Sequence, residues 1–126
     1  MYRNESNLKK TKDFFTSLNE LERFESIQWV QADITDIPSL WNIWEGIEYV
    51  YHAAAKISFD PRDEEQLRKI NTEGTANMVN LALQHDIKKF CYISSIATLG
   101  DLAEHETTIT EETEWNANKA HSDYAL

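Results

Sequence analysis

Residues 90–95, FCYISS, decide the fold: they form a short apolar run that ends on two hydroxyl side chains, Ser94 and Ser95. An amphipathic segment that begins at Pro61 precedes this run, and a polar, acidic stretch follows it. A buried run of this length after a helical pattern is typical of a strand in a parallel sheet. Open α/β sheets bind ligands beyond the carboxyl ends of their strands. We therefore expect Ser94 and Ser95 to lie where such a fold does its chemistry.

Helical and strand-like patterns alternate along the rest of the chain. Helical spacing is expected over residues 8–21, 36–46, 60–82 and 117–126, and strand patterns over residues 27–31, 49–55 and 90–95, with a surface loop over 100–117. This order predicts one α/β domain, and crossovers of this length impose parallel pairing. The strand ends at Asp33, at residues 52–55 and at Ser94 and Ser95 should then share one edge. Gly74 lies within the longest helix, which predicts that another segment approaches the helix closely there.

Composition excludes several functional classes. The 126 residues suffice for one domain, and the net charge of −10 comes from dispersed acidic side chains. Such a surface disfavours nucleic acids and anionic membranes as partners. The single cysteine excludes an internal disulfide, the four histidines lack the spacing of metal ligands, and no apolar run reaches a membrane span of about 20 residues. We expect a cytoplasmic protein that binds neither nucleic acid nor membrane and holds no metal.

Three groups at the strand ends and on the long helix are candidates for ligand binding. Asp33 follows a strand and could accept hydrogen bonds from the amine of a base, or serve only as a turn residue. The run from His52 through Ala53 and Ala54 places small side chains at a strand tip, which lets a flat or phosphorylated ligand reach the backbone, or simply allows tight packing. Asn71 lies on the long helix and could be a solvated helix residue.

Ser95 and Tyr124 are the candidate catalytic pair. A tyrosine hydroxyl transfers protons near neutral pH only where adjacent positive charge stabilises its phenolate. A serine hydroxyl can hold a substrate carbonyl or hydroxyl in place. Each residue alone has an ordinary structural explanation, but together with the strand-tip residues they indicate one site. Nucleophilic catalysis by Ser95 is disfavoured because no Gly-x-Ser-x-Gly elbow surrounds it.

Several motifs together resemble the extended short-chain dehydrogenase/reductase family, the NAD-dependent epimerase/dehydratases. Asp33 and Ile34 resemble its adenine-binding pair, and residues 52–54 resemble its cofactor strand. Residues 71–77, NTEGTAN, match its Asn-x-x-Gly-Thr-x-Asn helix, and residues 92–100 match its active-site strand and loop, with Ser95 rather than Ser94 in the catalytic position. Residues 110–113 resemble its acidic turn, and residues 123–126 the start of its Tyr-x-x-x-Lys motif.

The resemblance implies a Rossmann-like, doubly wound parallel sheet that is only partly present. The family's opening strand and its Gly-x-x-Gly-x-x-Gly loop are not in this sequence, and the catalytic lysine would lie two residues past Leu126. Residues 1–126 are therefore expected to form a partial NAD(P)-binding domain without a substrate domain, an internal fragment of a longer enzyme. Because removal of the first strand leaves two sheet edges facing a gap, we expect the chain alone to be neither a stable monomer nor active.

The implied cofactor is NADP or NAD, contacted by Arg3, Asp33, Ile34, His52, Ala53, Ala54, Asn71 and Ser94. Arg3 stands where NAD-selective enzymes place an acid, and an arginine there accommodates the NADP phosphate, so NADP is favoured. The resemblance implies an oxidoreductase acting on a hydroxyl or carbonyl carbon of a small molecule, more like hydroxysteroid dehydrogenases and dihydroflavonol reductases than like nucleotide-sugar epimerases. The alternatives are a nucleotide-sugar epimerase or dehydratase and a non-catalytic dinucleotide-binding sensor or scaffold. A homodimer is possible for the full-length parent.

Overall fold

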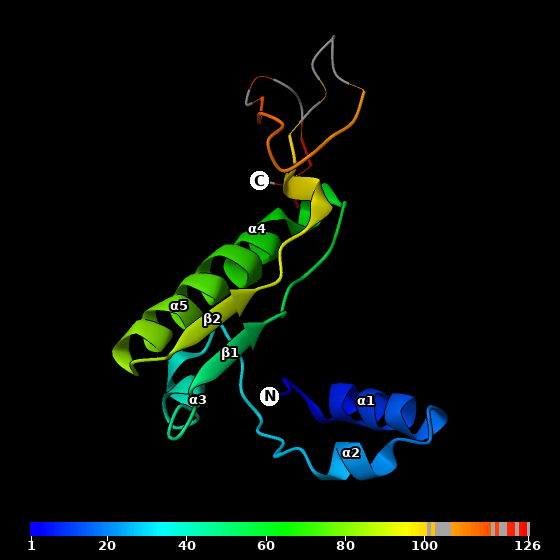
Figure 1. Cartoon of the computed structure of the whole chain (residues 1–126), viewed down its shortest axis with the longest axis vertical. Coiled ribbons are helices and arrows are strands. Elements are labelled where there is room, and N and C mark those ends of the chain that lie inside the picture. Colours follow the sequence, from blue (N-terminus) through cyan, green and yellow to red (C-terminus); the bar gives the residue numbers. More distant parts are fainter. Residues whose placement is uncertain (101, 103–106, 117, 119–120, 123, 126) are drawn as a thin grey trace.

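The computed structural model describes residues 1–100, 102, 107–116, 118, 121–122 and 124–125 (Figure 1). Its α-helices are α1 (Glu5–Ser17), α2 (Leu21–Glu25), α3 (Ile37–Trp41), α4 (Glu64–Leu67) and α5 (Thr75–Gln84), and its strands are β1 (Tyr49–His52) and β2 (Lys89–Tyr92). A π-helical segment, Arg68–Gly74, joins α4 to α5, and short 3₁₀ turns cover Pro61–Asp63 and Ile96–Thr98. Helices and strands are therefore mixed, around a small sheet.

β1 and β2 pair in parallel, as their helical crossover predicts. Tyr49 lies opposite Lys89 and His52 opposite Tyr92, and the Ile93 amide donates to the His52 carbonyl at 3.0 Å. β2 ends at Tyr92, so Ser94 and Ser95 lie just beyond the strand rather than within it. Both strands consequently deliver their following residues to the same edge of the sheet.

The helical path after residue 60 is nearly continuous through α4 and α5. Asp60 caps its start by accepting a hydrogen bond from the Arg62 amide at 3.0 Å, and Pro61 occupies the first turn, where it loses no helical hydrogen bond. The predicted inner face is largely confirmed, because Leu67, Met78, Leu81, Ala82 and Gly74 are buried. The widened π turn falls on the segment that carries Asn71 and Gly74.

Gly74 confirms the predicted close approach. A Cβ built on it would lie 2.7 Å from Ile34 Cδ1 and 2.8 Å from Ile34 Cγ1. Asn77 holds the same segment, because its Nδ2 donates to the Ile34 carbonyl at 2.9 Å. Ile34 and Ala32 thereby join the hydrophobic core, whose other buried members are Leu40, Trp44, Met78, Leu81 and Ala82. The core thus fixes Asp33, which lies between two of its members.

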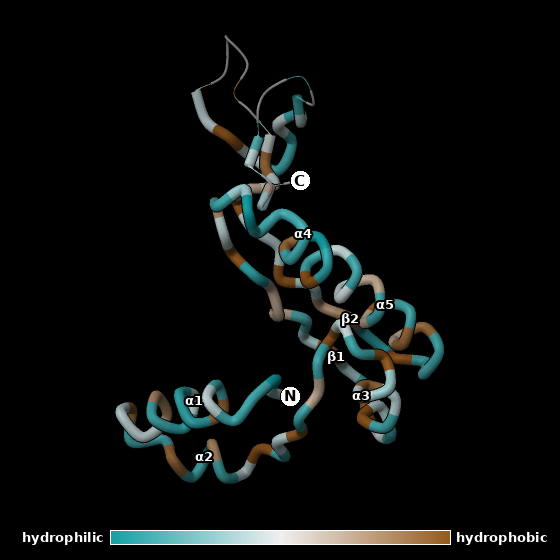
Figure 2. The backbone as a smooth tube through the Cα atoms, turned by 180° about the vertical axis from the view of Figure 1, so that it is seen from behind, coloured by the Kyte–Doolittle hydropathy of each residue, from teal (hydrophilic) through white to brown (hydrophobic). Residues whose placement is uncertain are grey.

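The first 31 residues form a separate hairpin of helices. Asn4 caps α1 by accepting from the Asn7 amide at 3.0 Å, and Phe24 of α2 packs on Trp29 with ring centroids 4.9 Å apart. Figure 1 shows α1 and α2 apart from the body made by β1, β2 and α5, and Figure 2 shows the same separation from behind.

The strand predicted over residues 27–31 is reduced to one parallel bridge between Tyr2 and Gln31. The Tyr2 amide donates to the Val30 carbonyl at 2.9 Å, and the Ala32 amide donates to the Tyr2 carbonyl at 3.0 Å. Asn4 already caps α1, so the partner segment is too short for these two bonds to extend into a ladder.

One face of the sheet is uncovered by the described residues. Val50, His52 and Phe90 face α5 and the core, whereas Tyr51 is 79% exposed and Cys91 is also exposed. The prediction that residues 90–95 form a buried run was therefore wrong for one side of the strand. A doubly wound fold has helices on both faces of its sheet, and the described elements supply them on one.

The last part of the chain is described only in pieces. Of the helix predicted over 117–126, residues 117, 119–120, 123 and 126 lie outside the described residues, and residues 118, 121–122 and 124–125 form turns or irregular structure. Gly100 is buried against the backbone of Thr113 and Glu114, so the loop after β2 closes onto the acidic turn. Within the described residues, no helix is long and apolar enough to cross a membrane.

Candidate cofactor and reaction site

Two adjacent pockets lie at the carboxyl edge of the sheet and divide the predicted site residues between them. The first has a volume of about 570 Å³, and among its lining residues are Arg3, Asp33, Ile34, Ala53 and Ala54. The second has a volume of about 430 Å³, and among its lining residues are Asn71, Ser94, Ser95 and Tyr124. Ala55 borders both pockets, which makes them neighbours along one surface.

Asp33 lines the first pocket, and one of its carboxylate oxygens already accepts hydrogen bonds within the protein. Its Oδ1 accepts the Thr35 amide and the Thr35 hydroxyl, both at 2.8 Å. The backbone hydrogen bond from Thr35 is the main reason that the pKa of Asp33 lies below its ordinary value, and the charges of Arg3 and Lys69 act in the same direction. Asp33 Oδ2 has no partner among the described residues, so an ionised acceptor faces Arg3 in this pocket.

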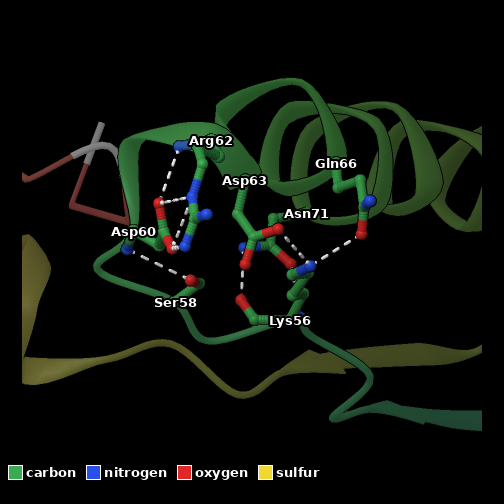
Figure 3. A network of polar contacts seen from close by, with 7 residues as sticks. All are labelled: Lys56, Ser58, Asp60, Arg62, Asp63, Gln66 and Asn71. Carbon is green, nitrogen blue, oxygen red and sulfur yellow. Dashed lines mark hydrogen bonds and ion pairs between the residues drawn. The ribbon is translucent and has the colours of Figure 1, made fainter.

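Asn71 holds the chain that leaves β1. Its Oδ1 accepts the Lys56 amide at 2.8 Å, and its Nδ2 donates to the Lys56 carbonyl at 2.9 Å (Figure 3). Both polar ends of the amide are thus used on one backbone unit. The small side chains of residues 53–55 stay exposed along the pockets while this clamp fixes the segment that follows them. The structure therefore places Asn71 as a positioning residue for the wall between the pockets.

His52 lies outside both pockets. Its side chain is 2% exposed, its Nε2 lies 2.9 Å from the Thr75 hydroxyl of α5, and its ring stacks near Tyr92. Burial holds the pKa of His52 below its ordinary value, which keeps the ring neutral at neutral pH. Strand alternation explains the placement: His52 points toward α5, whereas the next residue, Ala53, lines the first pocket.

Ser95 and Ser94 differ in their surroundings. Ser95 is half-buried and caps the 3₁₀ turn, because its Oγ accepts the Ala97 amide at 3.1 Å. Ser94 is exposed, and its hydroxyl lies 3.3 Å from that of Thr98. The Ser95 hydroxyl proton remains available for a ligand, since the recorded bond uses only the oxygen as acceptor.

Tyr124 reaches the second pocket from the far end of the chain. Its ring meets that of Phe59 edge to face, with centroids 6.1 Å apart and planes at 73°. Sequence reasoning missed Phe59 and the neighbouring Ile57. The sequence over residues 56–60 shows only an alternation of polar and apolar residues, and the structure alone reveals that the apolar side chains are the exposed ones.

The cations near the second pocket are already paired with acids. Arg68, which lines it, lies 2.6 Å from Glu73, and Lys56 lies 3.0 Å from Asp63. Among the described residues, no group of three or more histidine, cysteine or acidic side chains could hold a metal ion. The remaining polar groups that line this pocket are the Glu64 carboxylate and hydroxyl and amide groups.

The residues present suit the adenine and another flat part of the dinucleotide that the sequence implies, but not its pyrophosphate. The free oxygen of Asp33 can accept from an adenine amine, and the exposed small side chains of residues 53–55 let a flat ligand approach the backbone. The pyrophosphate has no such cradle here: the three glycines lie at residues 46, 74 and 100, and none stands at a turn from strand to helix.

Known proteins match this chain over most of its length. Cinnamoyl-CoA reductase 1 of Petunia hybrida is 32% identical over 101 residues, which cover 79% of this chain and 29% of that protein. Anthocyanidin reductase of Arabidopsis thaliana is 30% identical over 84 residues, covering 65% of this chain and 25% of that protein. A 3beta-hydroxysteroid-dehydrogenase/decarboxylase of Arabidopsis thaliana (isoform 2) is 29% identical over 84 residues, covering 67% of this chain and 15% of that protein.

The chain thus spans less than a third of the length of these relatives. The model of the NAD dependent epimerase/dehydratase family matches residues 3–126, nearly the whole chain, and this family implies a nicotinamide dinucleotide cofactor. The match confirms the resemblance carried by the motifs around Asp33, Asn71 and Ser95. This chain belongs to the NAD dependent epimerase/dehydratase family.

Proposed function

We propose that this chain carries the nucleotide-binding and reaction-centre part of an NAD(P)-dependent oxidoreductase acting on a hydroxyl or carbonyl carbon of a small molecule. One observation carries the proposal: Ser95 and Tyr124, 29 residues apart in sequence, line the same pocket of about 430 Å³. That pocket, the second of the two, adjoins the first pocket, whose lining suits an adenosine group. Adjacent pockets of this kind suit a dinucleotide laid across the carboxyl edge of the sheet.

Tyr124 and Ser95 would have different tasks in this reaction. When bound, the nicotinamide dinucleotide supplies or accepts the hydride. The Tyr124 hydroxyl gives a proton to the substrate oxygen during reduction and takes one back during oxidation. The Ser95 hydroxyl donates a hydrogen bond to the same oxygen and orients it. Asn71 holds the wall beside them through the Lys56 backbone.

Arg3 supports NADP as the preferred cofactor. It lines the first pocket beside Asp33 and lies at the chain end of the Tyr2–Gln31 bridge, where a 2′-phosphate would meet its guanidinium. The Asp33 carboxylate places a negative charge beside Arg3 in the same pocket, so NAD is the alternative cofactor. The complete protein's homodimeric state and cytoplasmic location remain predictions.

The charges near the reaction pocket favour a reductase over a nucleotide-sugar epimerase or dehydratase. A nucleotide sugar carries a diphosphate that needs cationic partners. Arg68, the cation that lines this pocket, is engaged by Glu73. The relatives are named as reductases and as a dehydrogenase/decarboxylase, which supports the same choice.

The test is cofactor turnover by the protein made from its complete reading frame. Consumption of one NADPH per molecule of substrate reduced supports the proposal, whereas product without net consumption indicates an epimerase or dehydratase. Cofactor binding with no turnover of any carbonyl or alcohol indicates a sensor or scaffold. Tyr124→Phe should lower kcat by roughly 10²- to 10⁴-fold. Tyr51→Phe, which removes an exposed hydroxyl elsewhere on the sheet, is the matched control and should leave kcat unchanged.

A further inference from the structure

Residues 56–60 reverse the usual placement of polar and apolar side chains. Lys56, Ser58 and Asp60 are half-buried, whereas Ile57 is 66% exposed and Phe59 is 75% exposed. An extended segment alternates its side chains between two faces, and a surface segment normally turns the apolar face inward. Here the apolar face looks outward, with Phe59 against Tyr124 of the proposed reaction centre.

The inward face explains why the segment keeps this orientation. Lys56 is clamped at its amide and carbonyl by Asn71, and its Nζ reaches Asp63 at 3.0 Å and Gln66 at 2.6 Å (Figure 3). Hydrogen bonds from Ser58 and Lys56 hold the pKa of Asp63 below its ordinary value. Turning the segment over would break this network, so the backbone is locked with its apolar side out.

Asp60 locks the other end of the segment. Its amide donates to the Ser58 hydroxyl oxygen at 3.2 Å, and its carboxylate accepts from Arg62 Nε at 2.9 Å (Figure 3). Asp60 and Arg62 form an ion pair of 2.5 Å. Each charge along the segment therefore has a partner of opposite sign, and the outward face presents only hydrocarbon.

The outward face begins at the proposed reaction centre. Phe59 touches the ring of Tyr124, which lines the reaction pocket, and Tyr92 and Ile93 line that pocket while remaining 53% and 54% exposed. Apolar surface therefore continues from the pocket wall, through Tyr124, to Phe59. On the side of the pocket that faces Phe59, a substrate held at the Tyr124 hydroxyl would extend along hydrocarbon.

We propose that Ile57 and Phe59 form an apolar wall of the substrate site and select uncharged substrates that carry a ring next to the reacting carbonyl or hydroxyl. This inference rests on the proposed function, because it takes Tyr124 as the point where the substrate reacts. An aromatic face and a branched aliphatic side chain together suit a flat ring, which packs on both without needing a hydrogen-bond partner.

The experiment uses the protein made from its complete reading frame and has two arms. In the first, kcat/KM with NADPH is measured for acetophenone and for butanone, a ring ketone and a small aliphatic one. In the second, the affinity of acetophenone is measured by ligand-observed NMR, without following turnover. The variants are Phe59→Ala and Ile57→Ala. The control is Leu83→Ala, because Leu83 is also 75% exposed but lies on α5.

The wall predicts a selective loss. Phe59→Ala should lower kcat/KM for acetophenone and weaken its binding by about 10-fold or more, with little change for butanone. Ile57→Ala should have a smaller effect of the same kind, and Leu83→Ala none. An equal loss for both ketones would overturn the inference, because Phe59 would then only position Tyr124. Unchanged binding of acetophenone in both variants would overturn it as well.

The two proposals fail separately in this design. If acetophenone binds in a Phe59-dependent way but no carbonyl compound consumes NADPH, the apolar surface stands and the oxidoreductase proposal fails. If butanone and acetophenone are both reduced and Phe59→Ala spares acetophenone, the oxidoreductase stands and the wall is refuted.

Discussion

Replacing Gly74 by alanine tests how tightly the long helix packs against the segment that carries Asp33. The new Cβ would lie 2.7 Å from Ile34 Cδ1, so the Ile34 side chain, which is buried in the core at 6% exposure, has to shift. Overpacking a core in this way costs ~1–3 kcal/mol, and alanine recovers about 1 kcal/mol of helix propensity. We expect Gly74→Ala to lower the free energy of unfolding by up to roughly 2 kcal/mol.

A double-mutant cycle with Ile34→Ala separates overpacking from propensity. Ile34→Ala alone should cost ~2–5 kcal/mol, because it leaves a cavity in the core. In that background the atoms that Gly74→Ala would strike are gone, so the same substitution should become neutral or stabilise by up to about 1 kcal/mol. Urea unfolding of the four proteins measures the coupling. Asn80→Ala, at an exposed position of α5, serves as the control for propensity alone.

Gly74→Ala should thus destabilise the natural protein but not the Ile34→Ala variant, and this difference makes the cycle decisive. Equal destabilisation by Gly74→Ala in both backgrounds would refute the contact with Ile34, and stabilisation in the natural background would refute the overpacking. The cofactor gives a second readout, because displacement of Ile34 moves Asp33. NADPH affinity should fall for Gly74→Ala and stay unchanged for Asn80→Ala.

Three further predictions concern the sheet edge. The pKa of His52 lies below its ordinary value because the ring is buried, so below about pH 6.5 the unfolded chain binds a proton that the folded chain excludes. The free energy of unfolding should therefore keep the full contribution of neutral His52 above that pH and decrease as the pH falls, by at most about 1.4 kcal/mol per pH unit. In the His52→Gln variant, the midpoint of urea unfolding should depend less on pH. Asn71→Ala removes both partners of the Lys56 backbone and should cost roughly 1–3 kcal/mol. Amide exchange at Lys56 should accelerate, and unchanged protection there would contradict the clamp. Arg3→Glu should weaken NADPH binding by roughly 10- to 100-fold with little effect on NADH, as measured by calorimetry, and a parallel loss of both would remove Arg3 from cofactor choice.

Local patterns in the sequence predicted the features that depend on nearest neighbours along the chain. The parallel pairing of β1 with β2 follows from the length of the helical crossover, and the inner face of the long helix follows from its periodicity. The close approach at Gly74 could be predicted because a glycine inside a helix is costly without a packing reason. The identity of the approaching residue, Ile34, could not be read from the pattern.

Features that depend on a distant partner were not predictable. The strand expected over residues 27–31 needs a neighbour to pair with, and Tyr2 supplies only a bridge. Cys91 follows the apolar pattern of a buried strand but is exposed, because burial requires a second layer of structure on that face. His52 lies in a cofactor motif, yet its ring turns toward Thr75 because strand alternation places it on the α5 side.

The sequence by itself determined the family and the parallel pairing of β1 with β2. These follow from motif spacing and from the handedness of the connections, which any chain with this pattern obeys. Tertiary structure alone decided that Asn71 spends its amide on the Lys56 backbone and that Phe59 meets Tyr124. Both contacts join residues far apart in sequence, and their geometry depends on how the core sets the distance between the elements that carry them.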